Sequence, residues 1–113
     1  SVIAELLRDL GQEGTTAVGG REGLDQLERV GPHIVFSDLG MPEVNGWDVA
    51  AAVRARRPET VMVLVSGLGS QIAPDSAQAR GVDIILSKPF SLEDVERVML
   101  EAADLLMRRC EAA

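Results

Sequence analysis

The sequence predicts an α/β domain in which helices cover both faces of a parallel sheet. Three short apolar runs, over 34–36, 61–65 and 82–86, alternate with segments whose apolar residues recur at helical spacing. Buried parallel strands are continuous apolar runs of this kind, and each needs a crossover, usually a helix, to reach the next. The chain of 113 residues has the length of one domain. We therefore expect one doubly wound parallel sheet.

The first half of the chain predicts two helices and one weak strand. Apolar residues at helical spacing predict helices over 2–10 and 24–30, and Gly31 ends the second. Residues 15–18 predict a short strand, which Gly14 weakens because glycine has no side chain to pack.

The second half predicts three further helices. One begins at Trp47 and ends before Pro58, because the residue before a proline disfavours helical geometry. Residues 71–80 form a weaker helix, and 91–110 form a long final helix that begins with a capping-box sequence. The glycine-rich segment 66–70 is expected to be a loop.

The composition argues against several classes of partner. The chain has 11 Lys+Arg against 18 Asp+Glu, a net charge of −7. That balance disfavours binding to nucleic acid through phosphate contacts and binding to a membrane through a basic patch. No apolar run approaches the roughly 20 residues that cross a bilayer. The single cysteine, Cys110, excludes an internal disulfide, so we expect a cytoplasmic protein without direct membrane contact.

Polar residues within two positions of the ends of the three apolar runs are the candidate functional residues. They are Asp38, Ser66 and Lys88, and parallel strands bring such residues to one edge of a sheet. Asp38 could be a nucleophile toward phosphorus, a metal ligand or a turn residue. Ser66 could bind a phosphoryl oxygen or lie in a loop, and Lys88, the only lysine, could neutralise a phosphoryl charge or be solvated.

The glycine-rich loop after Ser66 does not have a known nucleotide-binding pattern. It has no lysine after its glycines, and the chain has no G-x-G-x-x-G fingerprint. These absences argue against a small enzyme that binds a nucleotide or a flavin.

Four segments together carry a resemblance to a known family. They are VFSDLGMP over 35–42, NGW over 45–47, VLVSG over 63–67 and KPF over 88–90. In order and spacing the chain resembles the receiver domain of bacterial two-component response regulators and hybrid sensor kinases. The resemblance implies a flavodoxin-like fold, with residues 1–113 as a single receiver domain. It also implies a phosphorelay switch that is not itself an enzyme, phosphorylated by a histidine kinase or a histidine phosphotransfer domain.

The resemblance assigns a role to each strand-end residue. Asp38 would be the phosphoacceptor, Lys88 would pair with the phosphoryl group, and Ser66 would donate a hydrogen bond to it. Mg²⁺ would be held by Asp38 and by the main-chain carbonyl of Gly40. The supporting loop residues would be Met41, Pro42, Gly67 and Pro89, the last through a cis bond from Lys88.

The sequence departs from the family at its beginning. Receivers begin with a strand that ends in two acidic residues, and these residues hold the Mg²⁺, whereas this chain begins at the following helix. We therefore expect Mg²⁺ to be held weakly or not at all by this chain. In the family, this first strand lies between the strands that correspond to 15–18 and 34–37 here. Its absence is therefore expected to leave two hydrogen-bond ladders unpaired, one on each of these strands. Two explanations stay open: a fragment of a longer chain, or a degenerate pseudo-receiver that binds a partner without phosphorylation.

Other residues bear on switching and on the surface. Ile85 stands where the family often has Tyr or Phe, so the usual coupling between the serine and an aromatic ring is not expected. Trp47 is expected to pack a helix near the rim of the site. The arginines at 54, 56 and 57 and at 108 and 109 are expected to be solvated at helix ends. A C-terminal receiver of a hybrid kinase and a stand-alone regulator both remain open, as does a homodimer.

Overall fold

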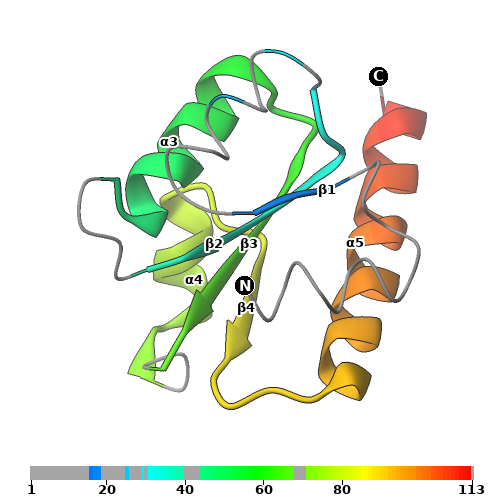
Figure 1. The fold of residues 1–113 in the computed structure, drawn as a ribbon. Coiled ribbons are helices and arrows are strands. Elements are labelled where there is room, and N and C mark those ends of the chain that lie inside the picture. Colours follow the sequence, from blue (N-terminus) through cyan, green and yellow to red (C-terminus); the bar gives the residue numbers. More distant parts are fainter. Residues whose placement is uncertain are drawn as a thin grey trace.

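The computed structural model describes residues 16–18, 25, 29, 31–39, 44–67 and 71–112. Within these residues, four parallel strands form one sheet in the order β1-β2-β3-β4 (Figure 1). The strands are β1 (Thr16–Val18), β2 (Ile34–Asp38), β3 (Val61–Ser66) and β4 (Ile84–Ser87). Every residue of β3 is buried, as a central strand covered on both faces requires. The predicted parallel sheet is confirmed.

Helices cover both faces of this sheet. They are α3 (Gly46–Arg56), α4 (Pro74–Ala79) and α5 (Leu92–Ala112). In Figure 1, α5 lies against one face, while α3 and α4 lie against the other. Alternate residues of β3 therefore enter two separate apolar clusters. Val63 packs in the cluster that includes residues of α5, and Leu64 packs in the cluster that includes residues of α3 and α4.

The pairing of β1 corrects one expectation. Because the family's first strand is missing, we expected the strands at 15–18 and 34–37 to lack hydrogen-bond partners on the sides that face each other. This expectation was wrong. β1 pairs directly with β2, with Thr16 beside Ile34 and Val18 beside Phe36. The physical reason is that buried backbone N–H and C=O groups must find partners, and the adjacent strands provide them.

Two element boundaries also differ from the predictions. The helix expected over 71–80 is reduced to Pro74–Ala79, because proline favours the first helical position and Arg80 already caps the end. The strand expected over 82–86 begins at Ile84, because the Val82 N–H donates to the carbonyl of Ala77 at 3.0 Å rather than to the sheet.

The remaining helix predictions have different outcomes. The final helix, expected over 91–110, spans Leu92–Ala112. The helix predicted over 2–10 lies outside the described residues. In the one predicted over 24–30, only Asp25 and Arg29 are described, and both are helical. Within the described segments, no helix is both long and apolar enough to span a bilayer.

Candidate phosphoacceptor site

The sheet places the predicted site residues at one edge. Asp38 is the last residue of β2 and Ser66 is the last of β3, while Lys88 directly follows β4. The register pairs Asp38 with Val65 and Ser66 with Ser87, so the three strands end at nearly the same level. The carboxyl edge of a parallel sheet is where α/β proteins bind their ligands.

Asp38 and Lys88 form an ion pair at this edge. The Lys88 Nζ lies 2.5 Å from the Asp38 Oδ1, and the two side chains are 48% and 46% exposed, respectively. Solvent reaches both groups, so this pair adds little to stability, as is usual for exposed ion pairs. Its importance is chemical, because a carboxylate open to solvent and held beside an ammonium group can be reached by an incoming anion.

Backbone hydrogen bonds hold both partners in position. The N–H of Lys88 donates to the carbonyl of Ser66 at 3.0 Å, and the N–H of Leu39 donates to that of Val65 at 3.0 Å. The Lys88–Pro89 peptide is cis, as predicted. Each strand-end residue is therefore fixed to β3, the buried centre of the sheet.

Gly46 packs directly behind the phosphoacceptor candidate. A Cβ at this position would lie 2.9 Å from the Asp38 carbonyl oxygen and 2.3 Å from the Leu64 Cδ1, so no larger residue fits without a shift. The capping box of Asn45 with Asp48 starts α3 at this point, at 3.0 and 3.1 Å. The NG pair of the sequence thus has two structural roles that the motif alone did not specify.

The two residues that follow the central strand have different environments. Ser66 is 5% exposed, whereas Gly67 is exposed and a Cβ there would meet nothing within 4 Å. The predicted supporting residues Met41 and Pro42 lie outside the described residues, and so does Gly40, whose carbonyl was predicted as a ligand of the metal.

The described residues only partly fit a bound magnesium ion. They contain no group of three or more His, Cys, Asp or Glu side chains that could hold a metal. Asp38 contributes one carboxylate, and Mg²⁺ commonly binds through one or two carboxylates together with waters and a phosphate. A resident site therefore needs ligands beyond this set.

Comparison with known proteins agrees with this geometry. The sequence matches the response regulator receiver domain family over residues 1–100. This chain belongs to that family.

Two curated relatives and one solved structure illustrate what this chain is similar to. It is 33% identical to the sensory transduction protein RegX3 of Mycobacterium bovis over 93 residues, which are 82% of this chain and 40% of RegX3. It is 30% identical to the chemotaxis protein CheY of Listeria monocytogenes, covering 77% of this chain and 73% of that one. The NtrX structure from Brucella abortus matches 98% of this chain and 26% of its own, with a TM-score of 0.84 at 26% identity. The receiver thus spans well under half of RegX3 and of NtrX.

The opposite end of the sheet, where β3 and β4 begin, has a partly buried ionic cluster that the sequence did not predict. Asp83 is 11% exposed and accepts from Arg109 at 2.5 Å, from Arg54 at 3.1 Å and from the Met62 N–H at 2.8 Å. Both arginines also donate to the carbonyl of Thr60. The expectation that Arg54 and Arg109 are solvated was wrong, because the ends of α3 and α5 converge on the start of β4.

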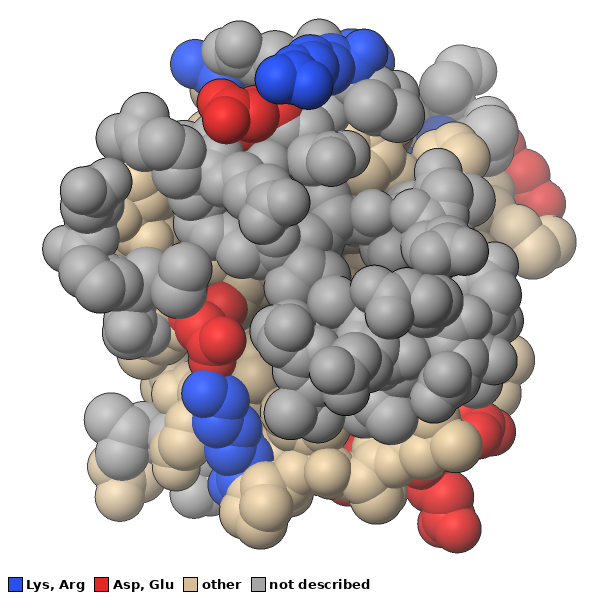
Figure 2. All heavy atoms as spheres, viewed as in Figure 1, with Lys and Arg blue, Asp and Glu red and all other residues tan. Residues whose placement is uncertain are grey.

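Partial burial makes this cluster sensitive to its balance of charge. Desolvation lowers the pKa of Arg54, and the carboxylate of Asp83 opposes that effect. The Arg54 Nε is buried with no hydrogen-bond partner, alone among the described side-chain atoms. In Figure 2, Arg side chains gather at the top of the view, the end at which α3 finishes in Figure 1, with acidic side chains beside them.

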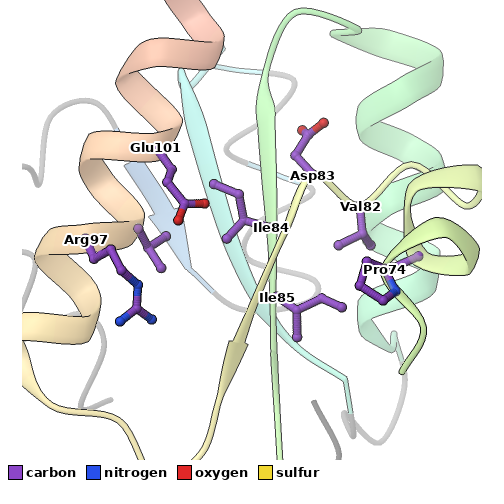
Figure 3. Close-up of a pocket in the computed structure, with 9 residues that line it drawn as sticks. Pro74, Val82, Asp83, Ile84, Ile85, Arg97 and Glu101 are labelled. Carbon is purple, nitrogen blue, oxygen red and sulfur yellow. The ribbon is translucent and has the colours of Figure 1, made fainter. Parts of the chain in front are cut away.

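A groove of about 250 Å³ lies apart from Asp38, over the edge strand β4. Figure 3 shows Ile84 directed toward α5 and Ile85 toward α4. Pro74 of α4 and Arg97 and Glu101 of α5 stand at its sides. The position of α4 therefore sets the width of this groove.

Proposed function

We propose that this receiver accepts a phosphoryl group on Asp38 from the phosphohistidine of a kinase or of a histidine phosphotransfer domain. The observation that supports the proposal is the ion pair of Asp38 with Lys88 at the solvent-open carboxyl edge of the sheet. A net charge of −7 and a single cysteine suit a cytoplasmic signalling domain without nucleic acid as its partner.

The reaction needs one nucleophile and one leaving group. A carboxylate oxygen of Asp38 attacks phosphorus, an O–P bond forms, and the P–N bond of the phosphohistidine breaks. The bonding electrons return to the imidazole nitrogen, and the product on Asp38 is an acyl phosphate. When bound, Mg²⁺ would offset charge on the phosphoryl oxygens together with the carboxylate of Asp38.

Lys88 and Ser66 stabilise the transferred group in this proposal. The Lys88 ammonium, already 2.5 Å from an Asp38 oxygen, offsets the charge gathered on the phosphoryl oxygens. The Ser66 hydroxyl donates a hydrogen bond to one of those oxygens. Met41 and Pro42 would support the loop after Asp38, and Gly40 would offer a carbonyl to the metal, while the small residue Gly67 leaves the approach open.

The test is phosphorylation by acetyl phosphate with Mg²⁺, followed by intact mass and peptide mapping. Wild type should gain one phosphoryl group on the peptide that contains Asp38, and Asp38→Asn should gain none. Asp104→Asn, which alters an exposed aspartate on α5, should label like wild type. Equal labelling of Asp38→Asn would refute the assignment. No labelling of wild type, either by acetyl phosphate or by a phosphorylated kinase domain, would favour an unphosphorylated interaction module.

A further inference from the structure

The contact between Asp38 and Lys88 brings an amine against a carboxylate that the proposed function activates. The Lys88 Nζ lies 2.5 Å from the Asp38 Oδ1, and that oxygen is bonded directly to the carboxyl carbon. Lys88 carries the only side-chain amine of the chain. A free carboxylate does not react with an amine, so the pair is chemically inert at rest. An acyl phosphate is different, because its carbonyl carbon is electrophilic and phosphate is a good leaving group.

The backbone keeps the two groups within reach of each other. The N–H of Lys88 donates to the Ser66 carbonyl at 3.0 Å, and the N–H of Leu39, in the peptide group that follows Asp38, donates to the Val65 carbonyl at 3.0 Å. Both site residues are therefore attached to β3, in which every residue is buried. Reacting groups that are held in alignment reach effective molarities of about 10⁵ M and above. The amine of Lys88 thus competes with water for the same carbonyl carbon.

Solvent limits how often the amine wins this competition. The side chains of Lys88 and Asp38 are 48% and 46% exposed, so water also reaches the acyl phosphate. Closed sites protect such intermediates by excluding water, and this site is open. We therefore expect the reaction with Lys88 to be a minor product of each phosphorylation, which accumulates over repeated cycles.

We propose that the acyl phosphate of Asp38 has a second fate, in which Lys88 Nζ attacks its carbonyl carbon and joins the two side chains by an amide. A C–N bond forms, the C–O bond to phosphate breaks, and the bonding electrons leave with the phosphate. Of the three ammonium protons, one stays on the amide nitrogen, one goes to phosphate and one to water. The inference rests on the proposed function, because phosphorylation supplies the activation. A cross-linked receiver has no carboxylate left at Asp38 and can no longer be phosphorylated.

Repeated additions of phosphoramidate with Mg²⁺, followed by intact mass and tryptic mapping, test this reaction. Phosphoramidate has a P–N bond and carries no acyl group that could be transferred to Lys88. Wild type should first gain a phosphoryl group and then yield a product lighter than the starting protein by one water. Its digest should contain peptides 30–54 and 81–97 joined through Asp38 and Lys88. The capacity for renewed labelling should fall by the fraction that is cross-linked.

Lys88→Arg is the matched control, because it keeps the cation and removes the nucleophilic amine. It should gain the phosphoryl group and lose no water. Loss of water from this variant too would indicate closure of the Asp38 side chain onto the following backbone N–H, and would overturn the assignment to Lys88. Adding Arg108→Lys to this variant places an amine beside Asp104, which the proposal leaves unphosphorylated, so this double variant should form no cross-link.

Two outcomes separate this inference from the proposed function. Wild type that gains and loses the phosphoryl group through many additions without forming joined peptides would overturn the amide, while leaving Asp38 as the phosphoacceptor. If no phosphoryl group is gained, the proposed function fails and the amide fails with it. A water-soluble carbodiimide, which activates carboxylates without phosphate, then tests the contact alone. Peptides joined through Asp38 and Lys88 would support the geometry, and their absence would refute it.

Discussion

Removal of the Asp83 carboxylate is the sharpest test of what holds this receiver together. Asp83→Ala takes away the common acceptor of Arg54, Arg109 and the Met62 N–H. The substitution leaves a strand amide unsatisfied and two cations facing each other at the end of the sheet distant from Asp38. No site residue is touched, so the effect reports on stability alone.

The structure sets the size of the expected loss. An unsatisfied buried amide costs about 1–3 kcal/mol. Breaking a buried ion pair costs about 3–5 kcal/mol, but here solvent reaches Arg54 and Arg109, which are 29% and 27% exposed. Both arginines also keep the Thr60 carbonyl as an acceptor. We therefore expect Asp83→Ala to lower the free energy of unfolding by about 3 kcal/mol, a large part of a typical domain's stability.

Urea unfolding followed by circular dichroism measures this loss. Asp83→Asn should fall between wild type and Asp83→Ala, because its amide oxygen can still accept from the Met62 N–H. Asp104→Ala removes only the exposed pair with Arg108, and it should cost less than about 0.5 kcal/mol. If Asp83→Ala came within about 1 kcal/mol of the Asp104 control, the cluster would not anchor α3 and α5 as argued.

Three further predictions follow from the same contacts. Gly46→Ala should lower the free energy of unfolding by about 1–3 kcal/mol and slow labelling of Asp38, because the new methyl group overlaps the core. Gly67→Ala is the control, because the space around Gly67 is open. It should change the free energy of unfolding by less than about 0.5 kcal/mol in the same urea titration. Lys88→Met should slow phosphorylation of Asp38 by about tenfold or more, as measured by the time course of intact mass, with little change in stability because the side chain is half exposed. Hydrogen bonds from Ser91, which caps the start of α5, lower the pKa of Asp94. The contribution of Asp94 to stability is therefore present above its unfolded pKa of about 3.9 and is lost as the pH falls below that value. Asp94→Asn should flatten the pH dependence of unfolding in that acidic range, and an unchanged profile would refute the role.

The site was more predictable from sequence than the contacts that support it. Asp38, Ser66 and Lys88 each follow an apolar run, and the geometry of parallel strands alone brings such residues to one edge. That reasoning needs only the order of elements along the chain. It gives no information about which side chains meet on the opposite edge, where Asp83 bonds to residues 26 and 29 positions away.

The missed features share a physical cause. An arginine in the last turn of a helix looks solvated in a sequence, because its burial depends on which elements pack beside it. Asp83 itself offered a weak signal, since a charged residue directly before a buried strand needs a partner. The direct pairing of β1 with β2 was missed for a similar reason: strands were assigned to places in a family's sheet, whereas backbone groups pair with the neighbour that is present.

The ion pair at the carboxyl edge has a practical consequence for handling the protein. Lys88 is the only side-chain amine among the 113 residues, and it lies against Asp38. Any reagent that acylates lysine, including the esters used to attach fluorophores or to couple proteins to sensor surfaces, would therefore modify the site itself. A receiver immobilised through its lysine would be attached to the surface by the face that meets its donor. Attachment through Cys110, near the end of α5 that is distant from Lys88, would leave that face accessible.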